Sequence, residues 1–155
     1  MNIITDKSLF IKQANSLITN EKNLITNLSN LSALYKEYLP NTNWVGFYIV
    51  DKEQKNLVLG PFQGKVACTR IPFNKGVCGH CHTTKETIYV KDVHQFPGHI
   101  ACDSATNSEL VIPIIQNNEV VALLDIDSIE FDRFSPEEVL AFSEVTKELF
   151  ENIKF

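Results

Sequence analysis

Residues 110–127 read LVIPIIQNNEVVALLDID. Two apolar runs, at 110–115 and 120–127, flank the polar segment 116–119, a composition typical of a tight turn between antiparallel strands. The second run begins fully apolar, as a central strand does. We therefore expect residues 120–127 to form a central strand of a sheet.

The segments before and after the hairpin predict an α+β fold. Aromatic and β-branched residues predict further strands at 43–50, 57–59, 66–71 and 88–90, with residues 60–64 as a loop. Apolar residues at three- and four-residue steps predict helices at 6–19 and 21–38, the second capped by Asn20. A short helix is expected at 76–86, and Ser135 with Glu138 marks the start of a C-terminal helix. Hairpin connections imply a mainly antiparallel central sheet flanked by the N- and C-terminal helices.

Length and charge narrow the class of protein. A chain of 155 residues predicts a single domain, residues 1–155, with one core. The net charge of −5 argues against a nucleic-acid surface, which needs a basic patch. Apolar runs are too short for a membrane span, and the first residues carry no secretion signal. We therefore expect a cytoplasmic protein, in which four cysteines favour redox or metal chemistry over structural crosslinks.

A long polar segment, residues 89–109, joins the strand at 88–90 to the hairpin. Pro97-Gly98 interrupts it, so it is expected to be a loop. It carries a thiol (Cys102), two imidazoles (His94 and His99) and several carboxylates. Loops this long in compact domains are usually functional or disordered, and the density of reactive groups favours a functional loop.

Two of the predicted strands carry further candidate residues. Trp44, Gly46 and Tyr48 share one face of their strand, where they either fill the core or wall a small pocket in which Gly46 leaves room for a ligand. Asp125 and Asp127 also share a face. Their strand either emerges into water at this end or places two carboxylates at the floor of a cleft.

Cys78, Cys81 and His82 form a Cys-x-x-Cys-His pattern. This pattern is found in c-type haem attachment, in zinc half-sites and in dithiol redox pairs. Haem attachment requires export, for which the sequence shows no signal. A zinc site would need two further ligands, for which His94 and His99 are candidates. The remaining interpretation is structural, a helix start with small residues packed against the sheet.

The polar loop resembles a known active site. Asp92-Val93-His94, the run FPGHIACDS at 96–104 and Asn107-Ser108-Glu109 are similar to the active-site loop of the free methionine-(R)-sulfoxide reductases, which are single-domain enzymes of the GAF fold. The resemblance covers nearly the whole chain, and it implies a GAF-like fold and the reduction of free methionine-(R)-sulfoxide to methionine. One departure is Cys81, where the family usually has a small residue; whether this thiol joins the redox relay stays open.

The resemblance also implies roles for individual residues. Cys102 would be the nucleophile, Cys68 the resolving thiol and Cys78 a secondary thiol. A thiolate attacks the sulfoxide sulfur, methionine leaves, and the resulting sulfenic acid condenses with a second thiol to form an intramolecular disulfide. Thioredoxin would then reduce this disulfide as an external partner, with no bound cofactor or metal. Trp44, with Tyr48, would contact the S-methyl group of the substrate.

Three carboxylates are expected to activate and bind the substrate: Glu109, Asp125 and Asp127. The charge of Asp103 opposes a thiolate at the neighbouring Cys102, and His99 is the nearest candidate cation. Protonation of the sulfoxide oxygen by one acid should therefore matter more than activation of the thiol, while the other acids bind the ammonium group. Asp92, His94 and His99 are expected to hold the shape of the loop.

A second class of function follows from the fold alone. GAF domains host many activities, so a small-ligand or redox sensor without catalysis is the alternative to the enzyme. The apolar N-terminal helices are also compatible with a homodimer. With four thiols present, the residues themselves leave open which cysteine pairs with Cys102.

Overall fold

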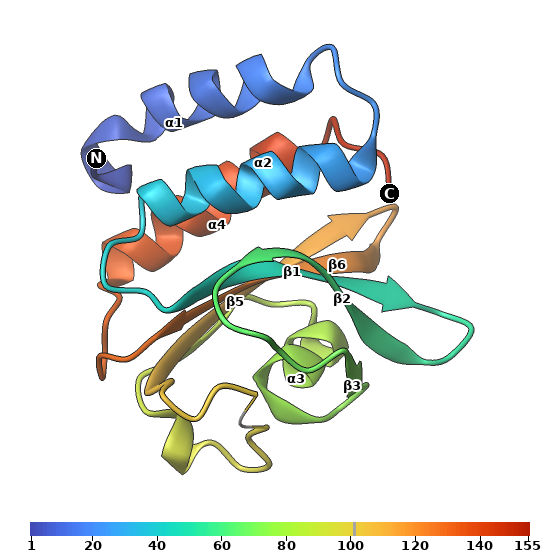
Figure 1. Ribbon diagram of the computed structural model, residues 1–155, viewed down its shortest axis with the longest axis vertical. Helices are drawn as coiled ribbons and strands as arrows, with labels where there is room; N and C mark the ends of the chain where they lie inside the picture. The colour runs from blue at the N-terminus through green and yellow to red at the C-terminus, as the bar shows by residue number, and fades with distance from the viewer. Residues whose placement is uncertain (101) are drawn as a thin grey trace.

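A computed structural model describes residues 1–100 and 102–155, and its centre is a six-stranded antiparallel sheet (Figure 1). The strand order is β3-β2-β1-β6-β5-β4. The strands are β1 (Trp44–Asp51), β2 (Asn56–Gln63), β3 (Arg70–Pro72), β4 (Ile88–Val90), β5 (Ser108–Gln116) and β6 (Glu119–Ser128). The predicted hairpin is β5–β6, and β6 lies between β5 and β1, which confirms its central place.

Three helices cover one face of the sheet: α1 (Ile3–Ile18), α2 (Leu24–Glu37) and α4 (Pro136–Phe150). In Figure 1, α2 and α4 lie next to the sheet and α1 forms an outer layer upon them. The main core fills this interface and includes the alternate strand residues Val45, Phe47, Leu124 and Ile126. The fold is therefore the predicted α+β arrangement, with N- and C-terminal helices packed together on an antiparallel sheet.

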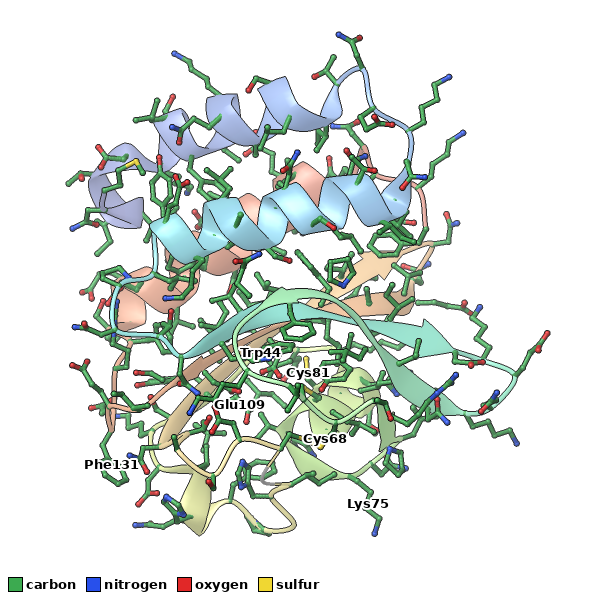
Figure 2. All side chains as sticks on the ribbon, viewed as in Figure 1. Trp44, Cys68, Lys75, Cys81, Glu109 and Phe131 are labelled. Carbon is green, nitrogen blue, oxygen red and sulfur yellow. A yellow bond between two sulfur atoms is a disulfide. The ribbon has the colours of Figure 1, made fainter. Side chains whose placement is uncertain are left out.

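The opposite face carries the smaller elements α3 (Gly76–Thr84), η1 (Val93–Gln95) and the long polar loop (Figure 1). A second cluster of buried residues, including Trp44, Tyr48, Cys78 and Cys81, packs there. Figure 2 shows Trp44, Cys68, Cys81 and Glu109 gathered on this side of the sheet, away from the three long helices. Of the residues on which the resemblance rests, Ala101 lies outside the described residues.

Strand register explains why polar residues collect on this face. Residues directly opposite one another in antiparallel strands point to the same side of the sheet. Asp127 is opposite Trp44 on β1 and Glu109 on β5, and Asp125 is opposite Gly46. The two-residue period then places Trp44, Tyr48, Glu109, Asp125 and Asp127 on one face.

Several predicted boundaries were wrong. The side chain of Asn23, not that of Asn20, caps α2 by accepting a hydrogen bond from the backbone N–H of Thr26. The helix α1 begins earlier, at Ile3, because Asn2 caps it. The helix α3 ends at Thr84, where Lys85 adopts a left-handed conformation. The capping box of Ser135 and Glu138 forms at the start of α4 as predicted.

The second and third strands also differ from the expectation. The strand β2 continues through residues 60–63, which were expected to be a loop, because it stays paired with β1 there. Pro61 is tolerated because β3 pairs only with Asn56, Leu57 and Val58 and leaves that edge of β2 free at Pro61. Since β3 spans only Arg70–Pro72, Cys68 lies in the connecting loop and not in a strand. Among the described residues, no helix is both long and apolar enough to cross a membrane.

Candidate active site

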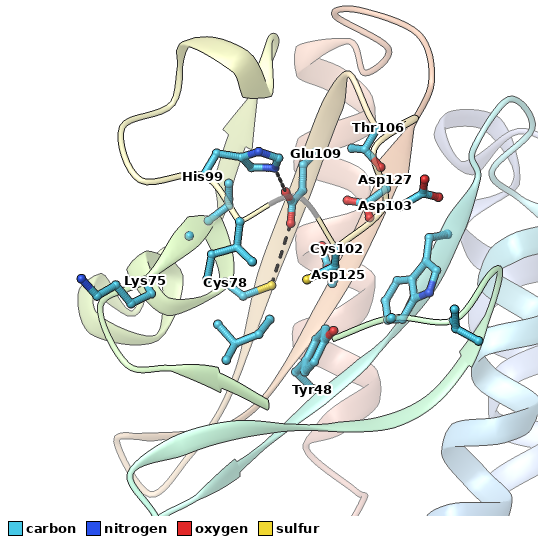
Figure 3. A pocket seen from close by; sticks show the side chains of 17 residues that line it. Tyr48, Lys75, Cys78, His99, Cys102, Asp103, Thr106, Glu109, Asp125 and Asp127 are labelled. Carbon is cyan, nitrogen blue, oxygen red and sulfur yellow. Dashed lines mark hydrogen bonds and ion pairs between the residues drawn. The ribbon is translucent and has the colours of Figure 1, made fainter. Parts of the chain in front are cut away.

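A cavity of about 30 Å³ lies between the polar face of the sheet, α3 and the long loop (Figure 3). This is room for about one water molecule. Its lining brings together most of the residues singled out from the sequence: Trp44, Tyr48, Cys78, His99, Cys102, Asp103, Glu109, Asp125 and Asp127. Asp125 and Asp127 therefore line this cavity, Asp125 as a buried residue and Asp127 as a partly exposed one.

Three carboxyl groups form the polar wall of this cavity. Glu109 and Asp125 are 7% and 5% exposed. Burial raises the pKa of Glu109 to about 8, and the charge of Asp127 contributes to the shift. Burial and the neighbouring carboxylates also hold the pKa values of Asp125 and Asp127 well above their usual range. The cluster thus keeps at least one carboxyl group protonated near neutral pH, as an acid catalyst requires.

The Cys78 thiol faces these acids from α3. Its Sγ lies 3.9 Å from Oε2 of Glu109, and it is 3% exposed. Burial, with the charges of Asp125 and Glu109, raises the pKa of Cys78 well above the ordinary value for a thiol. Cys78 is therefore held as a neutral thiol, which is a poor nucleophile.

Cys68 and Cys102 are joined by a disulfide bond across 34 residues of sequence, with their Cα atoms 5.4 Å apart. The hydroxyl of Tyr48 donates a hydrogen bond of 2.9 Å to the carbonyl oxygen of Cys68 and so fixes that side of the bridge. The backbone N–H of Cys102 donates to the carbonyl of Ile100 at 3.1 Å. The disulfide is the pairing that the family resemblance implies, and its Cys102 half lines the cavity.

Aromatic rings form the opposite wall. The Trp44 ring stacks between Phe62 and Tyr48, with centroid distances of 5.0 and 5.9 Å, and its Nε1–H donates to the carbonyl of Lys65. The expectation that Gly46 leaves room for a ligand is wrong. A Cβ atom at position 46 would overlap Phe62 and lie 2.8 Å from the Trp44 ring, so these neighbours already occupy the space.

The loop residues divide into two groups. The side chain of Asp92 accepts a hydrogen bond from the backbone N–H of His94, and the ring of His94 contacts Asn107 at 2.9 Å, so both shape the loop as expected. His99 instead faces the acids, with its Nε2 atom 3.8 Å from Oε1 of Glu109. Sequence reasoning also missed Thr106, a buried residue that lines the cavity and whose hydroxyl accepts a hydrogen bond of 3.1 Å from the side chain of Asn43. Its only sequence signal was its place in the loop.

The structure does not bring Cys78, Cys81 and His82 together as ligands of one zinc ion. Within residues 1–100 and 102–155, the potential ligand atoms that come within 4.8 Å of one another belong to Cys78, Glu109 and Asp125. Cys81 points instead to the carbonyl of Glu86 at 3.2 Å, and His82 stacks on Phe73 with ring centroids 4.0 Å apart. Because α3 turns Cys81 and His82 toward other neighbours, they cannot join Cys78 around one metal.

Replacing Cys81 by alanine should leave the rate of the sulfoxide reduction that the resemblance implies within about twofold of that of the unchanged protein. Cys81 is fully buried, and burial raises its pKa far above that of a free thiol, so it has neither access nor thiolate character. Steady-state assays with a dithiol reductant would check this, with Cys78→Ala as the matched variant on the same helix. A large loss for Cys81→Ala in a folded protein would place the extra thiol in the relay.

Comparison with known proteins connects this geometry to a family. The GAF-domain family model matches residues 31–149. A protein of Escherichia coli named free methionine-R-sulfoxide reductase is 45% identical over 135 residues, which cover 87% of this chain and 81% of that protein.

Solved structures agree with the sequence match. The reduced form of fRMsr from Staphylococcus aureus superposes with a TM-score of 0.88 at 44% identity, covering 95% of this chain and 94% of that one. Free methionine-R-sulfoxide reductase from Neisseria meningitidis, solved in complex with its substrate, gives a TM-score of 0.88 at 38% identity. That match covers 96% of this chain and 90% of the other.

Proposed function

The chain belongs to the free methionine-(R)-sulfoxide reductases of the GAF-domain family, and we propose from this premise how its own residues reduce free methionine-(R)-sulfoxide to methionine. The observation that carries the proposal is the Cys68–Cys102 disulfide beside a cavity lined by the carboxyl groups of Glu109, Asp125 and Asp127. A redox-active thiol pair and a proton donor are the two components that this reduction needs.

Substrate binding is assigned to the acids and the aromatic wall. Asp125 and Asp127 would hold the ammonium group of a free amino acid, because a charge-assisted partner compensates for burying their carboxylates. Each of them has a buried oxygen without a hydrogen-bond partner among the described residues, and such an atom can accept a donor from the substrate. Trp44 and Tyr48 would contact the S-methyl group from the other side.

The first chemical step is assigned to Cys102 and Glu109. The Cys102 thiolate attacks the sulfoxide sulfur while Glu109 donates its proton to the sulfoxide oxygen. The oxygen passes to Cys102 as a hydroxyl, which gives the sulfenic acid and releases methionine. The substrate sulfur is reduced by two electrons, and the Cys102 sulfur is oxidised by two.

The second step forms the disulfide. The Cys68 thiol attacks the sulfenic acid of Cys102, and its proton leaves with the hydroxyl as water. Thioredoxin, an external dithiol, then reduces the disulfide by exchange and is itself oxidised. Because the cavity of the disulfide form has room for about one water molecule, the segment with Cys102 must withdraw after reduction before an amino acid can enter.

The cellular compartment and the oligomeric state are also part of the proposal. Reduction of the disulfide by thioredoxin fits a cytoplasmic protein, where such dithiols maintain a reducing poise. A homodimer remains compatible with the exposed apolar side chains of the N-terminal helices, Leu9, Leu17 and Ile25. Light scattering at several protein concentrations would report the oligomeric state directly.

The test of this function compares three substrates in the presence of a thioredoxin system. Free methionine-(R)-sulfoxide should be reduced, whereas the (S) epimer and N-acetylmethionine-(R)-sulfoxide, which lacks the ammonium charge, should react far more slowly. Consumption of reductant measures each rate. No turnover of the (R) epimer would reject the proposal, and tight binding of a small ligand without turnover would point to a sensor.

A further inference from the structure

We propose that His99 carries the proton that Glu109 must regain in each turnover, so that His99 is a positioning residue acting through Glu109. The inference rests on the proposed function and deepens it. Sequence alone suggested that His99 shapes the loop or supplies a cation beside Cys102. The geometry points to the carboxyl cluster instead.

The contact itself is the first observation. Figure 3 shows the His99 ring directed from the long loop toward Glu109, with Nε2 at 3.8 Å from Oε1. The other oxygen of Glu109 faces the Cys78 sulfur at 3.9 Å. The separation of 3.8 Å is longer than a direct hydrogen bond, so the two side chains must move closer for a proton to pass directly between them.

Glu109 needs such a neighbour because little of its side chain, 9%, is exposed to solvent. After donating its proton, Glu109 is a carboxylate beside Asp125 and Asp127 of β6 and the neutral thiol of Cys78 on α3. Cys78 and Asp125 are 3% and 5% exposed, whereas the His99 side chain is 15% exposed. Of the two side chains that face the carboxyl oxygens of Glu109, Cys78 and His99, His99 therefore has the greater access to solvent.

The protonation state of the His99 imidazole is compatible with proton transfer to Glu109. Burial lowers the pKa of His99, so the ring is neutral at neutral pH and has one N–H donor and one acceptor nitrogen. A neutral ring leaves Glu109 protonated, while a cation at this distance would favour its ionised form. One proton enters at one ring nitrogen from water, and one leaves from the other nitrogen to the Glu109 carboxylate.

The protons released and taken up balance over one turnover. Cys102 loses one proton to water when it becomes a thiolate, and Glu109 gives one to the sulfoxide oxygen. His99 then returns one proton from water to Glu109. No oxidant or reductant beyond those of the proposed reaction is required.

The kinetic test uses His99→Gln beside His94→Gln in the reduced full-length protein. In a single turnover, Glu109 starts protonated, so His99→Gln should form one methionine per enzyme at a rate within about twofold of the unchanged protein. At saturating dithiol, its kcat should fall by roughly tenfold or more, with KM little changed. Added imidazole should raise the kcat of His99→Ala.

His94→Gln removes an imidazole that contacts Asn107 of the same loop and not the acids. Loss of loop shape alone would therefore slow the single turnover as well and would affect both variants. An unchanged kcat for His99→Gln, or equal losses in the two variants, would overturn the proposal.

A second readout does not depend on activity. In nuclear magnetic resonance titrations of the reduced protein, the ring nitrogen signals of His99 should shift as Glu109 ionises near pH 8. This shift should vanish in Glu109→Gln, and the His94 signals should not show it. If the His99 signals do not shift when Glu109 ionises, the relay is rejected even if the enzyme reduces its substrate. If those signals shift but the enzyme does not reduce methionine-(R)-sulfoxide, only the proposed reaction is rejected.

Discussion

Cys102→Ser should abolish methionine formation, with a loss of at least about 10⁴-fold, because a serine hydroxyl cannot attack sulfur or form a sulfenic acid at neutral pH. Cys68→Ser should behave differently. In this variant Cys102 can still attack one substrate molecule. The product is a sulfenic acid that cannot form the disulfide, because its partner thiol Cys68 is missing. The two variants thus separate the nucleophile from the resolving residue.

The measurement is methionine released per enzyme, first without and then with a thioredoxin system. Cys102→Ser should release none under either condition. Cys68→Ser should release about one equivalent and then turn over slowly, since thioredoxin reduces a disulfide readily but reaches a sulfenic acid in an enclosed site with difficulty. A Cys102→Ser protein that keeps multiple turnover would overturn the assignment and direct attention to Cys78.

Glu109→Gln should lower the rate of the first turnover by about 10²- to 10³-fold, because an amide of the same shape cannot donate a proton to the sulfoxide oxygen. The unchanged enzyme should show the corresponding pH dependence. Glu109 acts when protonated, so its contribution is present below its pKa of about 8 and is lost as the pH rises through that value. The variant should lack this decline at alkaline pH.

The matched control is Glu86→Gln, at an exposed residue just beyond α3 whose backbone carbonyl contacts Cys81. It should keep full activity. Thermal unfolding should show Glu109→Gln to be at least as stable as the unchanged protein, because the change removes a buried acid that repels the neighbouring carboxylates when ionised. A Glu109→Gln protein with normal rates at pH 7 would move the acid role to Asp125 or Asp127.

The fold was largely predictable because its signals are local. The polar residues 116–119 between two apolar runs predicted the β5–β6 hairpin, and Ser135 with Glu138 predicted the start of α4. The errors lie where a distant partner overrides a local signal. Gly60 and Pro61 are typical of a loop, yet pairing with β1 keeps their segment in β2. Asn20 and Asn23 are equally good caps locally, and the structure selects Asn23.

The candidate site was predictable only in part. The two-residue period of β6 placed Asp125 and Asp127 on one face without knowledge of the neighbouring strands. Which strands face them, and therefore that Glu109 stands opposite Asp127, required the register of the whole sheet. The space beside Gly46 could not be judged from sequence either, since Phe62 fills it from the next strand.

The sequence by itself determined the residues and their local faces: a thiol in a polar loop, two acids on one side of a strand, and apolar stripes on the helices. Only the tertiary structure decided that Cys68 bridges Cys102 across 34 residues, that Cys78 and not Cys81 faces the acids, and that His99 reaches Glu109. The reason is physical. Side-chain direction within a strand or helix follows from backbone geometry a few residues long, whereas contacts between distant segments depend on how the whole chain packs.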